Sequence, residues 1–273
     1  MKLLFIIFLG VGLGKASVAK SQTLPMNQKK LVKVVVAKPV AKSVAKPVVI
    51  GVEARHYNYL EPDMSIPVNH TGLLFGIWSE WYWENSLSQG KLYGNVLYGD
   101  LDYQGSVENQ NTQVVTPHSA KTTDLIVKIN SNIIFDLNKF IYIFAGGGFR
   151  YLYDRGVGSE FYTRTGNWVY LPLGAGFNYE KFSVDIEYDL IVYGSIKSNL
   201  SEAISTLPDL TNTQTGYGLL ITTRYRINEF WALYGIYEFW NLEKSNLVTV
   251  SAKQYHEPMN SSQSFGLKLG YHF

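Results

Sequence analysis

The chain has 273 residues, of which 17% are charged and 15% aromatic, and it contains no cysteine. Soluble domains carry about 25% charged residues, so this chain is poor in charge. The composition excludes a collagen-like chain, a disulfide scaffold, a globally disordered protein and any site built on a cysteine thiolate. The length allows one large domain or two small ones.

The formal net charge of +2 hides two regions of opposite charge. The first 47 residues contain nine lysines and no acid. The stretch from Val48 to Phe273 contains 15 lysines and arginines and all 22 acids, so it carries a net charge of −7. A basic arm can bind nucleic acid, but the segment that precedes it argues against that partner.

Residues 1–19 have the features of a secretory signal peptide. Lys2 supplies the positive charge, and Leu3–Leu13 is an apolar run that is too short for the roughly 20 residues of a membrane-spanning helix. Ser17-Val18-Ala19 places small residues where a signal peptidase needs them, which predicts cleavage after Ala19. Cleavage after Ala16 and a retained anchor helix are the alternatives. We therefore expect an exported protein that does not bind nucleic acid.

Residues 20–47 form a second segment, rich in Val, Ala, Lys and Pro. Proline blocks helices and strand ladders, and the lysines repel one another, so this segment should be extended and semi-rigid. It reads either as a solvated periplasmic spacer or as a basic tether that touches peptidoglycan or anionic lipid headgroups.

The rest of the chain, residues 48–273, is a succession of segments in which apolar and polar residues alternate. This period of two is typical of strands with two unlike faces. We count ten such segments: Val49–Tyr59, Thr71–Trp83, Lys91–Tyr103, Thr122–Phe135, Lys139–Tyr153, Thr163–Tyr179, Lys181–Ser195, Gln214–Ile227, Phe230–Glu243 and Gln263–Phe273.

The connections between these segments alternate between short turns and long loops. That asymmetry, with an even number of strands, is typical of a bacterial outer-membrane β-barrel. The pattern predicts an all-β chain with one antiparallel transmembrane barrel of about ten strands, extracellular loops and both termini in the periplasm. A hairpin hidden in Leu60–His70 or Gln104–Lys121 would change the strand count by two.

Aromatic residues gather near both kinds of connection, as the two interfacial girdles of a membrane barrel require. An exported β-sandwich is the alternative, but it would have edges to protect and no regular alternation of loop lengths. The residues near the long loops are Tyr57, Tyr59, Tyr103, Tyr151, Tyr153, Trp168, Tyr170 and Tyr217, and those near the short turns are Trp81, Trp83, Phe135, Phe140, Phe177, Tyr179, Phe182, Phe230, Trp231 and Phe273.

The final strand ends on Leu267, Leu269, Tyr271 and Phe273. This ending resembles the assembly signal of Gram-negative outer-membrane β-barrel proteins, and the resemblance extends over the leader and the whole alternating region. It implies a location in the outer membrane. It also implies contact with outer-membrane lipid and lipopolysaccharide and recognition by the barrel-assembly machinery.

Assigning the apolar parity of each strand to lipid leaves charged residues of both signs for the lumen. A ten-stranded barrel is close to the size that side chains can fill, whereas sixteen or more strands leave a channel. We expect Asp185, Glu187 and Asp189 to pair with Arg224 and Arg226 on the neighbouring strand. The main lumen candidates are Glu53, Arg55, Glu80, Asp100, Asp102, Lys128, Arg150, Asp185, Glu187, Asp189, Arg224, Arg226, Glu238 and Lys268.

The omptin surface proteases are also ten-stranded barrels, and in that family two acids face an Asp–His pair across the extracellular mouth. Asp100 and Asp102 resemble one half of that family's site, a pair of acids at the outer end of a strand. The facing strand offers Asp189 but no Asp-x-His pair, so half of the constellation is missing. We therefore expect no catalytic residue, and an omptin-like hydrolase is a remote alternative.

Two functions remain open. The first is a structural or surface-interaction protein with a largely filled polar lumen. The second is a small porin-like channel, which the acidic body would make mildly cation-preferring. His256 and Glu257 are adjacent in the last long loop, but two residues do not define a metal site. The sequence thus predicts no metal and no cofactor.

Overall fold

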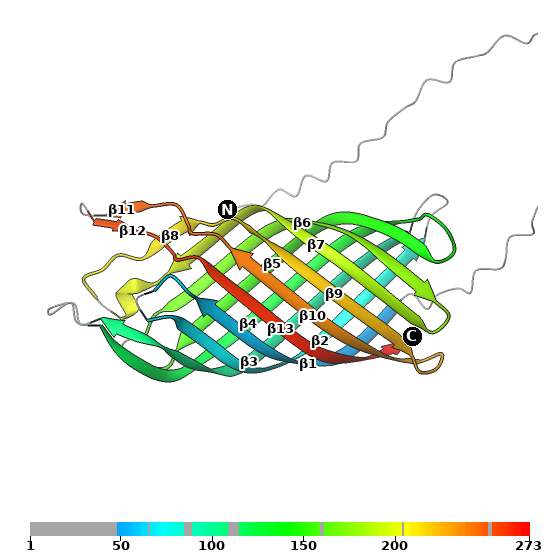
Figure 1. Cartoon of the computed structure of the whole chain (residues 1–273), viewed down its shortest axis with the longest axis horizontal. Helices are drawn as coiled ribbons and strands as arrows, with labels where there is room; N and C mark the ends of the chain where they lie inside the picture. The colour runs from blue at the N-terminus through cyan, green and yellow to red at the C-terminus, as the bar shows by residue number, and fades with distance from the viewer. Residues whose placement is uncertain are drawn as a thin grey trace, which may run out of the picture. The chain divides into compact units, whose positions relative to one another are not determined.

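A computed structural model describes residues 48–64, 66–84, 89–108, 115–158, 161–203, 205–250 and 253–273. The predicted signal peptide and basic linker lie outside the described residues. Within the described ranges, none of the helical segments is long and apolar enough to cross a membrane. The described chain is almost entirely strand, as the alternating pattern predicts (Figure 1).

Ten long strands form one sheet that closes on itself. β1 pairs with β13 and β6 pairs with β7, so each strand of the ring has two antiparallel neighbours. The predicted ten-stranded antiparallel barrel is confirmed. Its strands are β1 (Val48–Glu61), β2 (Val68–Glu84), β3 (Gln89–Glu108), β4 (Val115–Asp136), β5 (Ile141–Gly156), β6 (Thr163–Tyr179), β7 (Phe182–Ser198), β9 (Gly216–Arg226), β10 (Trp231–Leu242) and β13 (Asn260–His272).

Three further strands and a 3-10 turn belong to the long connections rather than to the wall. β8 (Leu210–Thr213) pairs with the end of β7, and β11 (Val248–Val250) pairs with β12 (Lys253–Tyr255). The 3-10 turn η1 spans Leu200–Glu202. The predicted loop Gln104–Lys121 is shorter than expected, because β3 and β4 continue to pair as far as Glu108 and Val115.

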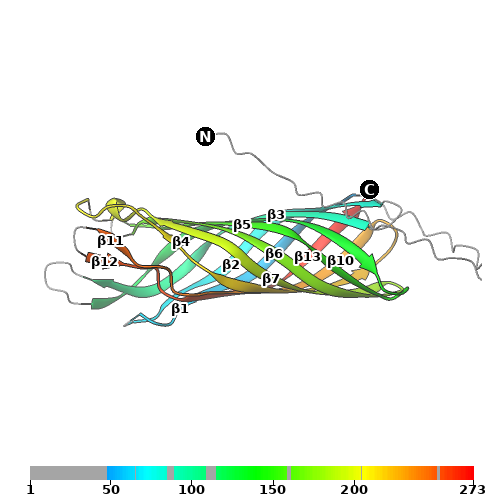
Figure 2. The ribbon, with the colours of Figure 1, turned by 90° about the horizontal axis from the view of Figure 1, so that it is seen from above.

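The two ends of the barrel differ, and we name them by their connections. At the short-turn end lie tight turns such as Leu137–Phe140 and Glu180–Lys181, together with the start of β1 and the end of β13. At the long-loop end lie η1, β8, β11, β12, the end of β3 and the start of β4 (Figures 1 and 2).

The two faces of the wall differ as strictly as the sequence pattern requires. Apolar side chains on the outer parity are widely exposed, whereas the inner parity is buried. β7 changes parity once, because a register shift opposite Val169 and Tyr170 leaves both Val192 and Tyr193 facing outwards. The most exposed outer residues include Val52, Phe75, Ile77, Phe265 and Leu267.

The aromatic bands are only partly as expected. Near the short-turn end, Trp81, Trp83, Phe135, Tyr179 and Phe273 are exposed on the outer face. Near the long-loop end, the predicted aromatic band is wrong for most residues. Five of the eight predicted aromatic side chains point into the barrel instead of towards its outer surface. These five buried residues are Tyr57, Tyr59, Tyr103, Trp168 and Tyr170.

Candidate functional site: the charged lumen

Most of the predicted lumen residues are found inside the barrel. Their side chains project from the inner parity of eight different strands, so closure of the ring brings together charges that are far apart in the sequence. The buried ones are Glu53, Arg55, Glu80, Lys128, Arg150, Glu187, Asp189, Glu238 and Lys268. Asp185 and Arg224 are half-buried on the same inner surface.

Three of the predicted lumen residues lie elsewhere. Asp100 and Asp102 are exposed on the outer parity of β3, which they share with Tyr98, and Asp102 pairs there with Lys121. The sequence assignment failed because the alternation of β3 continues without interruption to the long-loop end, where its outer face becomes polar. Arg226 is exposed at the short-turn end, beyond the last residue of β9 that pairs with β7.

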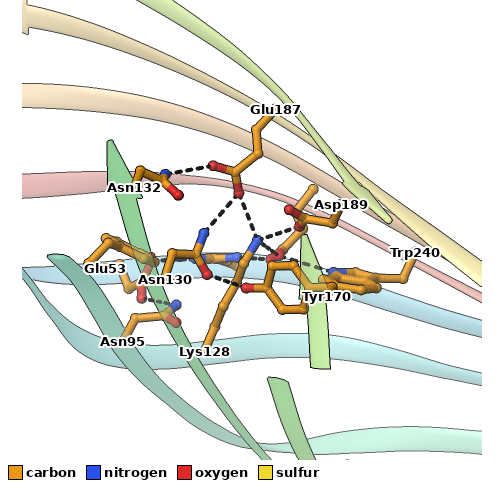
Figure 3. A network of polar contacts seen from close by, with 12 residues as sticks. Glu53, Asn95, Lys128, Asn130, Asn132, Tyr170, Glu187, Asp189 and Trp240 are labelled. Atoms are coloured by element: carbon orange, nitrogen blue, oxygen red, sulfur yellow. Dashed lines mark hydrogen bonds and ion pairs between the residues drawn. The ribbon is translucent and has the colours of Figure 1, made fainter. Parts of the chain in front are cut away.

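At mid-height, the Lys128 ammonium sits among three carboxylates (Figure 3). Its Nζ donates to Asp189 Oδ2 at 2.9 Å, to Glu238 Oε1 at 3.1 Å and to Glu187 Oε1 at 3.5 Å. β4 and β10 are five positions apart in a ring of ten strands, so the contact with Glu238 spans the barrel diameter. Arg224, which the sequence analysis expected to pair with the acids of β7, lies nearer the short-turn end, opposite Ser183.

A second cluster completes this middle layer. Arg55 donates two hydrogen bonds to Glu53 Oε2, at 2.8 and 3.0 Å, and one to Glu238 Oε2 at 2.5 Å. Lys268 Nζ lies 3.6 Å from the same Glu53 oxygen and donates to the Tyr93 hydroxyl at 2.7 Å. Glu238 therefore joins the Arg55 and Lys128 clusters into one network.

The charges of the middle layer balance. Four carboxylates face four cations, so the layer is neutral as a whole and each charge has a partner of opposite sign or an aromatic face. Buried charges require such pairing, since an unpaired one loses its hydration without compensation. The carboxylates are Glu53, Glu187, Asp189 and Glu238, and the cations are Arg55, Lys128, Arg150 and Lys268.

Aromatic rings fill the space between these charges. The Arg150 guanidinium lies 4.9 Å from the Trp240 ring centre and 5.2 Å from that of Trp168. Tyr170 packs edge-on against Trp240 and donates to Asn130. The Tyr170 ring occupies the space in front of Gly148, where a Cβ atom would lie 2.2 Å from it. Glycine is therefore needed at that point of the wall, because the ring lies against the backbone.

Nearer the long-loop end, a second bridge crosses the lumen. Arg164 of β6 donates to Glu61 of β1 at 2.5 Å and to Asp154 Oδ2 at 2.7 and 3.0 Å. β6 and β1 are also five positions apart in the ring, so this contact spans the diameter as well. The Tyr59 hydroxyl donates to Glu61 and accepts from Arg164 at 3.3 Å.

Nearer the short-turn end, a third layer of polar contacts involves β3, β5, β6, β7 and β9. Lys91 Nζ lies 3.7 Å from Asp185 Oδ2, and the Tyr142 hydroxyl donates to the other Asp185 oxygen. Arg224 donates to Asn178 Oδ1 at 3.4 Å. The contacts of Lys91 and Arg224 are long, and the side chains of Lys91 and Asp185 are more exposed than the charges at mid-height.

Two small cavities lie among the described lumen residues. One cavity of about 10 Å³ lies beside Arg55, Arg150 and Trp240, and another of about 30 Å³ lies between Trp78, Lys91 and neighbouring residues. A single water needs roughly 10–15 Å³, so these cavities hold one or two waters each. Neither volume accommodates a hydrated ion or a metabolite.

The long connections make polar contacts at the long-loop end. Glu257 is buried there and accepts a hydrogen bond from Ser198, and burial raises the pKa of its carboxyl despite the opposing effect of Arg164. Glu202 of η1 accepts from the backbone and hydroxyl of Thr163 at 2.9 and 2.7 Å, and these hydrogen bonds lower the pKa of its carboxyl.

Sequence reasoning missed the neutral members of this network. Asn95, Asn130, Tyr93, Tyr170 and Trp240 each contact a lumen charge. They share the inner parity of their strands with the predicted charges, so the same alternation could have found them. The arrangement can hold strands together and exclude solvent.

No protein-family model matches the sequence, and no curated protein matches it. Solved structures do resemble the barrel. The outer membrane protease OmpT of Escherichia coli matches with 10% identity and a TM-score of 0.49, over 84% of this chain and 98% of that one. The translocator domain of the autotransporter NalP from Neisseria meningitidis matches with 11% identity and a TM-score of 0.43, over 85% and 90%.

Neisserial surface protein A is a further match, with 10% identity and a TM-score of 0.37, over 83% of this chain and 97% of that one. The matched structures include a protease, a translocator domain and a surface protein, so they share an architecture and not an activity. The closed antiparallel β-barrel of this chain is shown by its own strand pairing.

Proposed function

We propose that this protein is an integral outer-membrane barrel with a sealed lumen, whose function is carried by its long-loop end as a structural or surface-interaction protein. In this arrangement the long loops face the exterior and both termini of the barrel face the periplasm. Outer-membrane lipid and lipopolysaccharide surround the wall, and the barrel-assembly machinery inserts it. The proposed partner of the basic segment 20–47 is peptidoglycan or anionic lipid headgroups, to which its lysines would be attracted.

The outer face of the wall supports the membrane location. A belt of exposed apolar side chains would be costly in water, whereas it matches the hydrocarbon core of a bilayer. The exposed aromatic residues at the short-turn end are suited to one interface. Closure of the ring leaves no unpaired strand edge, which a bilayer-spanning sheet requires.

The observation that carries the proposal is the pair of bridges across the full diameter of the barrel. Lys128 meets Glu238 at mid-height, and Arg164 meets Glu61 nearer the long-loop end. A pore that conducts needs a continuous water-filled path lined by its charges. Here the charges are neutralised by one another and the rings of Trp168, Tyr170 and Trp240 fill the remaining space, which favours a sealed barrel over a channel.

Catalysis finds less support. Asp100 and Asp102, the acids that resemble half of an omptin site, point away from the lumen, and Asp102 is engaged with Lys121. We therefore propose a non-enzymatic role. A direct check is an assay of the folded wild type and of Asp100→Asn with a mixture of peptide substrates. Cleavage by the wild type that is lost in the variant would contradict the proposal.

Single-channel recording in planar bilayers tests the sealed lumen. Folded barrel, verified by its heat-modifiable gel mobility, should insert without discrete current steps. Reproducible steps with a cation-favouring reversal potential would instead establish the porin-like alternative and make Asp185 and Glu187 selectivity candidates. A known porin inserted under the same conditions controls for the sensitivity of the bilayer.

A further inference from the structure

Three potential metal ligands meet inside the barrel, between the middle layer and the long-loop end. His70 of β2, Asp124 of β4 and Asp154 of β5 each offer a ligand atom, and these atoms all lie within 4.8 Å of one another. All three residues are buried, with relative exposures of 2%, 2% and 5%. Asp124 and Asp154 are direct cross-strand partners, so their carboxylates share the inner face.

The second observation is that one carboxylate oxygen of this cluster lacks a hydrogen-bond partner. Asp154 Oδ1 is buried and has none among the described residues, although its Oδ2 is held by Arg164. That Oδ1 lies 4.0 Å from His70 Nδ1, which is too far for a hydrogen bond and is a separation that a shared ion could bridge. Buried polar atoms without a partner are uncommon and point to an unseen water or ion.

The charges around the cluster do not balance as those of the middle layer do. Arg164 forms ion pairs with both Glu61 and Asp154, so one positive charge faces two carboxylates there. Among the described residues, Asp124 accepts a hydrogen bond from the Thr122 hydroxyl at 3.4 Å, and Arg164 and, more weakly, Arg150 act on its carboxylate from further away. Two neighbouring buried carboxylates repel each other unless a cation or a proton lies between them.

The chemistry of the donors selects a class of ion. One imidazole nitrogen with two carboxylate oxygens is a set that suits Zn²⁺, Mn²⁺ and similar divalent first-row metals, whereas Ca²⁺ takes six to eight oxygens. With bonds of about 2.1 Å, two ligands of one ion lie roughly 3 to 4.2 Å apart. The present separations need only a small rotation of one carboxylate, and Thr122 Oγ1, 3.5 Å from His70 Nδ1, is a further oxygen at the site.

We propose that His70, Asp124 and Asp154 form a binding site for one divalent first-row transition-metal ion. The ion joins β2, β4 and β5 near the mouth of the barrel and balances the carboxylate that Arg164 leaves without a cation. The aromatic rings of Tyr59 and Tyr103, 5.0 and 5.2 Å from the His70 ring, limit the access of water to it. The site is independent of whether the lumen conducts, so its test is separate from the bilayer experiment.

The test uses the untagged full-length mature barrel, folded and dialysed against a chelator, and titrated with ZnCl₂, MnCl₂ or CaCl₂. We expect one equivalent of Zn²⁺ or Mn²⁺ to bind, with a higher unfolding temperature that the chelator reverses. Asp124→Asn and His70→Ala should weaken this binding at least tenfold. His56→Ala and Asp100→Asn, which lie outside the lumen, are matched controls that should bind as the wild type does.

Asp124→Asn also separates loss of the site from loss of the fold. Because it removes carboxylate repulsion, it should raise the unfolding temperature of the metal-free barrel while abolishing the metal-dependent increase. Zn²⁺ binding that survives His70→Ala or Asp124→Asn unchanged, equal affinity for Ca²⁺, or less than one fifth of an equivalent of metal bound by the folded wild type would each overturn the proposal.

Discussion

Lys128 of β4 and Glu238 of β10 meet at 3.1 Å across the full width of the barrel, and the same ammonium also contacts Asp189 of β7 at 2.9 Å. One side chain thus ties together three strands that are not neighbours in the sheet. Hydrogen bonds of the ladder hold each strand to its two neighbours. Contacts of this kind connect strands across the lumen that share no ladder hydrogen bonds.

Lys128→Met should destabilise the barrel by about 3–5 kcal/mol, because it leaves Glu187, Asp189 and Glu238 buried without their shared cation. The urea midpoint of the folded barrel measures this loss. Lys121→Met is the matched control, since Lys121 and its partner Asp102 are both about 60% exposed. That change should stay within about 0.5 kcal/mol. Equal effects of the two variants would contradict the role assigned to Lys128.

Arg55 and Glu238 should be energetically coupled. In a double-mutant cycle with Arg55→Met and Glu238→Gln, we expect a coupling energy of about 1–3 kcal/mol. Each single change removes the ion-pair partner of a charge that remains buried. Arg55 and Asp209 provide a distant pair for comparison, because Asp209 lies in an exposed connection. Additivity of the Arg55 and Glu238 changes, within about 0.3 kcal/mol, would show that the contact contributes nothing.

Gly148→Ala should destabilise the barrel by about 1–3 kcal/mol, because the added Cβ would lie 2.2 Å from the buried ring of Tyr170. The neighbouring Gly147→Ala is the control. A Cβ at Gly147 meets nothing within 4 Å, so that variant should be nearly neutral. Urea unfolding compares the two directly, and a larger loss for Gly147→Ala than for Gly148→Ala would refute the packing argument.

The last long connection should be more firmly held at mildly acidic pH. Burial raises the pKa of Glu257 above its ordinary value of 4.5, so the folded loop binds a proton more readily than the unfolded loop does. Stability from this group is therefore greatest below 4.5 and is lost as the pH rises from there through the raised pKa. The Ser245 amide donates to the Glu257 carbonyl, and the Glu257 amide donates to the Ser245 hydroxyl. Hydrogen exchange at these two amides should be slower at pH 5 than at pH 8 after correction for intrinsic rates.

Glu257→Gln serves as the control for that effect. It removes the titrating group while keeping an oxygen that can accept from Ser198, so the corrected protection should become independent of pH between 5 and 8. Persistence of the full pH dependence in this variant would assign it to another group. Glu243→Gln, at an exposed position before the same loop, should leave the dependence unchanged.

The sequence by itself determined the strands and their two faces. A period of two can be read locally, because successive side chains of a strand point to opposite sides whatever the strand pairs with. That alternation correctly placed Glu53, Arg55 and Lys128 inside the barrel. It misplaced Asp100 and Asp102, which lie on the outer face of β3. The sequence assigns polar residues to the lumen, but the outer face also becomes polar where a strand extends beyond the apolar belt.

Only the tertiary structure decided which side chains meet. Lys128 contacts Glu238 rather than a partner on a neighbouring strand, and His70 comes to lie beside Asp124 and Asp154, although no spacing in the sequence links these residues. Contacts across a barrel depend on ring closure and on the stagger of each strand against the next. Both are properties of the whole ring of ten strands. The pattern along one strand therefore predicts which residues line the lumen, but not which of them contact one another.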